Sequence, residues 1–206
     1  MHKFIILAAC LLLGACAANQ QSLYEQLVRT GSSPVASNTL EAIHNTQAIP
    51  LPVNTGLLTP NWPISANEPR MSFGSSISNY RMFSLELKKG ERYTLNVNSI
   101  CHSPCMGFNK LAVKPRALLL DANGAVIAKK PSRVSTVLGQ ITLSWDGEAA
   151  ENGTYYLLVA ADNDDVGRTI VIDDAWINNS PLMLVKVDMS SSPFGDIRAY
   201  SSPRSN

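Results

Sequence analysis

The chain has 206 residues, of which 45% are hydrophobic, and its 17 Lys and Arg nearly balance 16 Asp and Glu to give a formal net charge of +1. This balance excludes the broad basic face by which proteins bind nucleic acid, so we expect no nucleic-acid partner. The length suits one domain with a tail, and the apolar fraction is sufficient for a hydrophobic core.

The N-terminus reads MHKFIILAACLLLGAC. Lys3 precedes an apolar run from Phe4 to Leu13, which is too short for a permanent membrane span and typical of a signal-peptide core. Residues 13–16, Leu-Gly-Ala-Cys, resemble the bacterial lipobox, whose cysteine is acylated and becomes the mature N-terminus. The resemblance implies a signal peptide over residues 1–15 and a palmitate-type lipid on Cys16. An ordinary secretory signal with an incidental Cys16 is the alternative.

The residue after Cys16 indicates the membrane. Aspartate at this position retains such lipoproteins in the inner membrane, whereas Ala17 implies sorting to the outer membrane. Acyl chains contribute about 0.8 kcal/mol per buried methylene, so a multiply acylated cysteine anchors a protein stably. We therefore expect a bacterial envelope protein, lipid-anchored in the outer membrane, with its domain facing the periplasm.

Two cysteines remain after the signal and the lipid are accounted for, in the segment Cys101-His-Ser-Pro-Cys105. Because the periplasm is oxidising, we predict a Cys101–Cys105 disulfide that fixes the shape of a small loop. Two alternatives stay open. Cys101, His102, Cys105 and Met106 are all ligand types suited to Cu(I), and the two cysteines also suit a labile redox pair.

Residues 16–70 are rich in Ser, Asn, Thr and Pro. Within them, residues 22–30 predict a short helix, since Leu23 and Leu27 share a face and Gly31 follows as a stop signal. The rest of this segment is expected to be an irregular tether that lifts the domain from the membrane.

From residue 71 the sequence consists of short apolar segments separated by turn residues. They lie at 83–87, 93–97, 118–120, 126–127, 141–145, 154–159 and 182–187. The first two are predicted to form an antiparallel pair across Lys89-Gly90, and Asn123-Gly124 predicts a hairpin. The pattern predicts an all-β fold, an antiparallel β-sandwich of jelly-roll type over residues 71–190, followed by a flexible C-terminal tail at 191–206.

The segments SNYRMFSLEL, ERYTLNVNS, VKPRALLLDANGAVIAKKP and NGTYYLLVAADND follow in this order. The order resembles the periplasmic maltose-operon protein (MalM-like) family. It is also similar to the pre-peptidase C-terminal (PPC-type) β-sandwich, through Leu120, Asp121, Gly124 and residues 153–156. These strand-and-turn patterns specify architecture better than activity. The resemblance implies an accessory protein of envelope carbohydrate uptake with no catalytic residues.

Residues that carry chemistry are few. His44 and His102 are the histidines of the mature chain, and neither lies in a triad or metal motif, so we predict no enzyme, no catalytic residue and no cofactor. Asp162 and Asp164 have the D-x-D spacing of a calcium loop, but the completing glutamate is missing. A solvated turn is the preferred explanation, and we predict no metal site.

Trp145 and Trp176 are the candidate ligand-binding residues, because indole rings stack on sugars, although strand spacing also fits core positions. The leading prediction is a non-enzymatic outer-membrane lipoprotein whose β-sandwich binds an envelope protein or glycan, with maltodextrin-type carbohydrate uptake as the associated process. The alternative is a copper-handling or redox lipoprotein that uses Cys101, His102, Cys105 and Met106.

Overall fold

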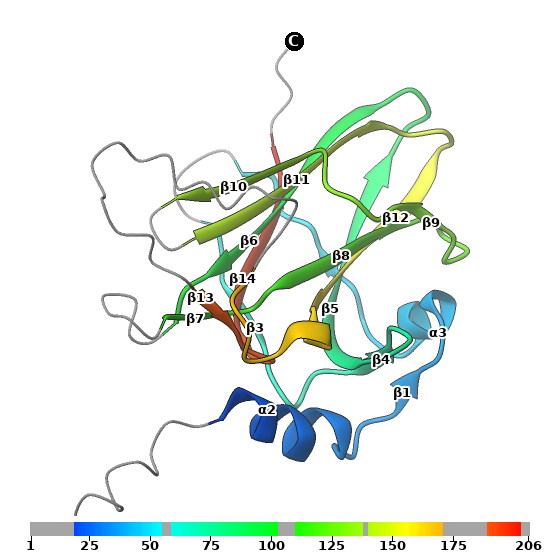
Figure 1. Ribbon diagram of the computed structural model, residues 1–206. Helices are drawn as coiled ribbons and strands as arrows, with labels where there is room; N and C mark the ends of the chain where they lie inside the picture. The colour runs from blue at the N-terminus through cyan, green and yellow to red at the C-terminus, as the bar shows by residue number, and fades with distance from the viewer. Residues whose placement is uncertain (1–18, 55–58, 103–109, 138–139, 171–188, 203–206) are drawn as a thin grey trace, which may run out of the picture.

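The computed structural model describes residues 19–54, 59–102, 110–137, 140–170 and 189–202. Within these ranges strands dominate and pair mainly antiparallel, which confirms the predicted all-β class. Figure 1 shows two curled sheets with short helices beside them. The predicted lipidation site Cys16 and the predicted strand at 182–187 lie outside the described residues.

The larger sheet has the order β1-β4-β5-β12-β8-β9, with β2 beside β5. Its strands are β1 (Val35–Ala36), β2 (Ile49–Pro50), β4 (Arg70–Ser72), β5 (Ile77–Leu87), β8 (Pro115–Leu120), β9 (Val126–Ala128) and β12 (Gly153–Ala161). The antiparallel neighbours of β12 are β5 and β8. Residues 157–161 of β12 are fully buried, because both faces of this strand are covered.

The smaller sheet has the order β10-β11-β6-β14-β3. Its strands are β3 (Trp62–Ile64), β6 (Arg92–Ile100), β10 (Arg133–Val137), β11 (Gln140–Glu148) and β14 (Gly195–Ser201). A further pair, β7 (Lys110–Ala112) and β13 (Met189–Ser191), is short and parallel.

One predicted pairing is wrong. The segments 83–87 and 93–97 do not pair with each other, because β5 belongs to the larger sheet and β6 to the smaller one. The turn at 88–91 therefore crosses between sheets. Phe83 and Leu87 of β5 enter the same core as Leu95 and Val97 of β6, so both strands keep their predicted alternation while facing each other across the core.

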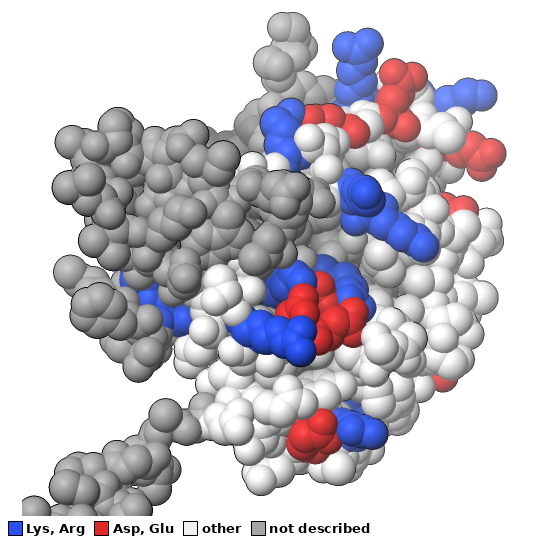
Figure 2. Space-filling model, in the orientation of Figure 1, with Lys and Arg blue, Asp and Glu red and all other residues white. Residues whose placement is uncertain are grey.

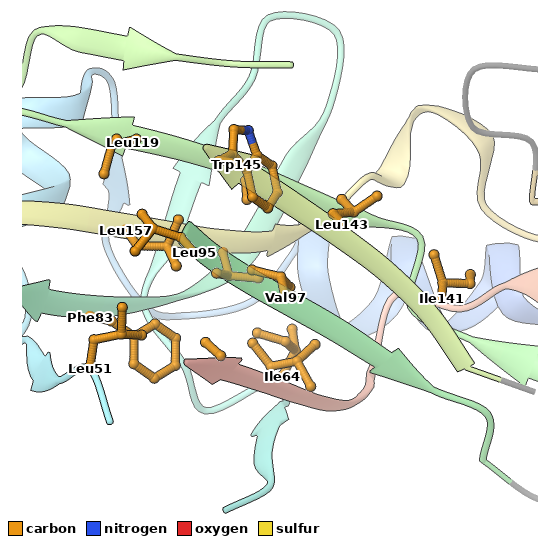
Figure 3. Packing of buried hydrophobic residues seen from close by; sticks show 14 of the residues in the cluster. Leu51, Ile64, Phe83, Leu95, Val97, Leu119, Ile141, Leu143, Trp145 and Leu157 are labelled. Atoms are coloured by element: carbon orange, nitrogen blue, oxygen red, sulfur yellow. The ribbon is translucent and has the colours of Figure 1, made fainter. Parts of the chain in front are cut away.

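The main core lies between the two sheets, as Figure 3 shows. Phe83, Leu119 and Leu157 from the larger sheet meet Leu95 and Leu143 from the smaller one, and all are at most 3% exposed. Each such side chain contributes about 1.5–3 kcal/mol when fully buried. A second cluster, which includes residues 120 and 158, covers the other face of the larger sheet.

The β8–β9 hairpin confirms the predicted turn at Asn123-Gly124. The carboxylate of Asp121 accepts hydrogen bonds from the backbone N–H groups of Asn123 (2.9 Å) and Ala125 (2.8 Å). Gly124 has φ +78°, and a Cβ there would lie 2.8 Å from the backbone nitrogen of Leu40, so only glycine fits the turn without displacing that neighbour.

The N-terminal segment corrects the expectation of a mostly irregular tether over 16–70. It contains α2 (Gln20–Leu23), η1 (Tyr24–Arg29) and α3 (Thr39–His44) besides β1 to β4. The helix predicted at 22–30 is present within α2 and η1. Turn residues and prolines break this segment into short elements, but buried contacts at Val28, Ala36 and Ala42 hold them against the larger sheet.

Arg70 of β4 joins this segment to the sheet although it is only 5% exposed. Its Nη1 donates to the carbonyl of Val28 (2.7 Å), and its Nε donates to the carbonyl of Ser33 (2.9 Å). Val28 lies in the last turn of η1, where carbonyl groups lack helical partners and the helix dipole favours a cation. The guanidinium thus caps η1 from the neighbouring strand.

The flexible tail predicted at 191–206 is also corrected. Strand β14 lies between β6 and β3 in the smaller sheet, paired from Ile197↔Ser99 to Ser201↔Leu95. Ile197 and Ala199 are fully buried in the main core. Serines and an arginine around these residues give the segment a polar composition, yet its alternate residues face inward as in any half-buried strand.

Candidate functional site

A hollow of about 510 Å³ opens beside β8, and we call it the edge hollow. Its walls are β8 and the crossover from β9 to β10. Its lining comprises Phe73, Lys114, Pro115, Arg116, Ala117, Leu118, Val126, Lys129, Lys130, Pro131, Leu143, Trp145 and Asp162.

The edge hollow exists because β9 is short. Strand β9 pairs with β8 only at Leu119↔Ala128 and Leu120↔Val126. Continued in register, it would bring Lys130 opposite Ala117, but the chain bends at Lys130 and crosses to the smaller sheet. The half of β8 from residue 115 to 118 therefore has no strand partner on its β9 side among the described residues.

The register of β8 determines which backbone groups face the edge hollow. The backbone N–H of Asp162 donates to the carbonyl of Lys114 (2.7 Å), so residue 114 directs its backbone groups toward β12. Backbone groups alternate in direction along a strand, and those of Ala117 consequently point away from β12. The edge thus offers the N–H and C=O of Ala117 and the C=O of Pro115.

Two lysines at the rim leave an excess of positive charge. Lys129 and Lys130 are exposed. Among the described residues neither lysine forms an ion pair. Their ammonium groups are therefore available to an anionic ligand that enters the edge hollow.

An ion-pair cluster forms another wall of the edge hollow. Lys114 Nζ lies 3.1 Å from Asp162 Oδ2 and 2.6 Å from Asp165 Oδ2, and Arg116 Nη2 lies 2.5 Å from Asp164 Oδ2. Arg116 also pairs with Asp162. Asp162 follows β12 and is the N-cap of the short helix η2 (Asn163–Asp165), which contains the other two acidic residues. Figure 2 shows Lys, Arg, Asp and Glu side chains gathered near the middle of the visible face, over η2 and the start of β8.

The pKa values of this cluster keep it charged. Burial would raise the pKa of Asp164, but the nearby hydroxyl groups of Ser76 and Ser75 and the guanidinium of Arg116 outweigh burial and lower it to about 2. Burial would lower the pKa of Lys114, but Asp165 and the neighbouring carboxylate raise it instead. Arg168 Nη1 also lies 3.6 Å from Asp165 Oδ1, so three cations balance the three carboxylates. The cluster therefore supports the wall and leaves the rim lysines unopposed among the described residues.

Asp162 and Asp164, the carboxylates with calcium-loop spacing, both lie in this cluster. Both carboxylates are occupied by Lys114 and Arg116, and no group of three or more metal-binding side chains occurs among the described residues. The D-x-D spacing therefore serves a structural ion-pair network in the segment that the structure describes.

Trp145 lines the edge hollow, although not as a sugar-stacking platform. The side chain is only 2% exposed and packs in the main core (Figure 3), so its ring faces are covered. Its Nε1–H is buried and has no hydrogen-bond acceptor among the described residues. An unpaired buried donor is costly. Trp176 lies outside the described residues.

Only one cysteine of the predicted Cys101–Cys105 disulfide lies among the described residues. Cys101 is buried, while Cys105 and Met106 lie outside the described residues, so the disulfide and the copper site stay predictions. The neighbouring His102 is partly buried, and burial lowers its pKa, with partial compensation by the charge of Asp196.

Sequence reasoning missed the rim lysines and the open half of β8. The signal was present in Ala128-Lys129-Lys130-Pro131, where two charges and a proline directly follow a short return strand. Such a segment ends a strand early, because proline has no N–H for the ladder. What the sequence does not contain is the position of the crossover relative to β8.

A second hollow of about 600 Å³ lies near Tyr93 and Val53. Its charged groups are already engaged. Glu86 Oε1 accepts from Thr154 Oγ1 (2.6 Å), and Glu91 Oε2 accepts from the backbone N–H of residue 88 (2.9 Å). It offers hydroxyl groups and an aromatic ring, and its two carboxylates outnumber the single guanidinium of Arg92.

Comparisons with protein-family models, with curated protein sequences and with solved structures return no match for this chain. Among the described residues, no helix is both long and apolar enough to cross a membrane. The resemblances to the MalM-like family and the PPC-type β-sandwich thus remain predictions, and the edge hollow carries the functional argument.

Proposed function

We propose that this chain is a non-enzymatic binding module of the bacterial envelope, anchored in the outer membrane through a lipid on Cys16, and that its edge hollow binds an anionic ligand. The single observation that carries the binding role is the pair of rim lysines, Lys129 and Lys130, above the open half of β8. These two ammonium groups have no carboxylate partner in the part of the chain that the structure describes, so they attract anions and increase the rate of encounter with them.

The polar groups inside the edge hollow support the same proposal. The backbone N–H of Ala117 points away from β12, and such a donor is what a carboxylate or phosphate requires. Arg116 and Lys114 are held in place by their own ion pairs, so they shape the wall without competing for the rim. For the fold, we propose that the two sheets form the β-sandwich expected from the sequence.

Charge reversal tests this function. The purified full chain in non-ionic detergent is titrated with tripolyphosphate and with a short glutamate-rich peptide, using calorimetry or fluorescence anisotropy. In the Lys129→Glu/Lys130→Glu variant we expect affinity for both probes to fall about tenfold or more, because each attraction becomes a repulsion.

The matched control is Lys88→Glu/Lys89→Glu. These lysines are also adjacent and exposed, and they do not line the edge hollow, so the variant has the same change in net charge. Affinity should change about twofold at most, because distant surface charges are screened by salt. Equal losses in both variants, or no binding of either probe by the wild type, would refute an anion site in the edge hollow.

We propose carbohydrate binding as a second candidate function, relocated from Trp145 to the hollow near Tyr93. The supporting observation is a half-buried aromatic ring beside the hydroxyl-bearing residues Ser84, Thr94 and Ser202. Titration of the full chain with maltotriose, compared between wild type and Tyr93→Ala, tests it. Heat of binding that Tyr93→Ala abolishes would support sugar recognition, and no heat with wild type would contradict it.

A further inference from the structure

We propose that the ligand of the edge hollow is an extended acidic peptide segment of another protein, which pairs with β8 as an additional strand. This inference rests on the proposed anion-binding function and names the class of partner. The occupant would take the place that β9 leaves when the chain bends at Lys130.

The backbone of β8 provides the pairing groups. The open half from 115 to 118 spans about 13 Å, enough for a four-residue strand. Along this stretch the N–H and C=O of Ala117 and the C=O of Pro115 point away from β12, as the register requires. Strand addition to an exposed edge uses such backbone groups for affinity and side-chain contacts for specificity.

The side chains around the open edge specify an acidic sequence. Lys129 and Lys130 face an incoming strand from the crossover, and their charges are unopposed among the described residues. The three carboxylates nearby are balanced by Lys114, Arg116 and Arg168, so they do not repel a second set of carboxylates. Charge complementarity therefore favours a peptide rich in Glu or Asp over a neutral or basic one.

The interior of the edge hollow favours a peptide over a small anion. Its wall includes the apolar side chains of Leu118, Val126 and Leu143, which a phosphate ion would leave without contacts. A strand presents side chains to both faces in alternation, so acidic residues can meet the lysines while apolar residues meet this wall.

The test uses a fluorescein-labelled peptide, Glu-Val-Glu-Val-Glu with blocked ends, and the full chain in non-ionic detergent. Fluorescence anisotropy measures its Kd. Two singly N-methylated versions, with the methyl group on one or the other of two adjacent central residues, each remove a backbone donor from one edge of the peptide. We expect one of the two to bind about tenfold more weakly and the other to bind like the parent, because only one edge pairs with β8.

Variants of the chain provide the second arm. Lys129→Glu/Lys130→Glu should weaken peptide binding about tenfold or more, and the control Lys88→Glu/Lys89→Glu about twofold at most. Ala117→Pro removes the outward N–H of β8 and should weaken binding without changing the far-ultraviolet spectrum. If Ala117→Pro does not fold, the N-methylated peptides alone decide the question.

The outcomes separate this inference from the proposed function. If both N-methylated peptides bind like the parent while binding still depends on Lys129 and Lys130, the edge hollow binds anions but not as a strand, and the inference fails alone. If neither the peptide nor tripolyphosphate binds, both fail. If the wild type sediments as a dimer that the peptide does not dissociate, the open edge of β8 pairs with a second copy and the acidic-peptide assignment is overturned.

Discussion

Residues 19–54 are attached to the larger sheet and residues 195–201 belong to the smaller sheet, and the two segments are held by different kinds of contact. The N-terminal segment adds only two-residue strands, β1 and β2, at the border of the larger sheet. Side chains hold it in place, notably Arg70 donating to Val28 and Ser33, and Tyr80 Oη donating to the carbonyl of Ala42 (2.8 Å). Strand β14 is instead held by a continuous backbone ladder inside the smaller sheet.

This difference predicts two kinds of stability. A ladder flanked on both sides is cooperative, so damage to β14 should unfold the whole domain. A segment held by a few side-chain hydrogen bonds should open locally when one of them is removed, and the sheets beneath it should stay folded. Four substitutions test the contrast, from the largest expected effect to the smallest.

Ile197→Ala should lower the free energy of unfolding by about 2–5 kcal/mol, because it leaves a cavity in the core between the sheets. Ile197 is fully buried, whereas Arg198 on the same strand faces outward and donates to Asn61 (2.6 Å). Arg198→Ala is therefore the matched control and should cost about 1 kcal/mol at most. Urea denaturation followed by circular dichroism measures both, and equal losses would place Ile197 outside the cooperative core.

Arg70→Met should cost about 2–3 kcal/mol, because it leaves the carbonyls of Val28 and Ser33 without their donor. Limited proteolysis should cut the N-terminal segment of this variant first, while hydrogen exchange in β6 and β14 stays slow. The control is Arg29→Met, whose exposed i,i+4 pair with Glu25 is worth about 0.3–0.5 kcal/mol. If Arg70→Met unfolds both sheets together, the N-terminal segment is part of the same cooperative unit.

Tyr80→Phe should cost about 1 kcal/mol through the lost hydrogen bond to Ala42. Burial, with a smaller effect from the charge of Glu41, raises the pKa of Tyr80 to about 12. The unfolded chain loses this proton near pH 10, before the folded chain does, so stability should fall between about pH 10 and 12 in the wild type. Unfolding measured across that range should show a shallower decline in Tyr80→Phe, and an unchanged decline would contradict the assignment.

A substitution of His102 should give the smallest of the four effects, and it concerns β14 and not the N-terminal segment. Burial lowers its pKa, and a Cβ at Gly195, the first residue of β14, would lie 2.9 Å from its Nδ1. The unfolded chain therefore takes up this proton at a higher pH than the folded one, so stability should decrease as pH falls below about 6.5. His102→Gln should flatten this decrease in thermal unfolding between pH 7.5 and 5.

Local signals in the sequence predicted the elements well where a turn and its strands are contiguous. The hairpin around Asn123-Gly124 and the buried strand 154–159 are both found, since turn residues and apolar runs act within a few residues of each other. The partner of a strand depends on distant residues instead. Nothing in 83–97 indicates that the turn between its two strands crosses from one sheet to the other.

The candidate site depends even more on distant contacts. Asp162 and Asp164 have the spacing of a calcium loop, and only the positions of Lys114 and Arg116, some fifty residues earlier, turn them into an ion-pair cluster. Trp145 was predictable as an aromatic in a strand, but its burial with an unpaired Nε1–H was not. Composition likewise misled for β14, because a half-buried strand needs few apolar residues when they alternate.

The insertion of β14 between β6 and β3 also sets the order of events during biosynthesis. A ribosome, or a channel that threads the chain N-terminus first, releases β6 and β3 well before residues 195–201 emerge. During that interval β6 exposes a long unpaired edge, which is a template for pairing with other chains. The smaller sheet can close only after residues 195–201 have been delivered, so a factor that shields β6 until then would raise the yield of folded protein.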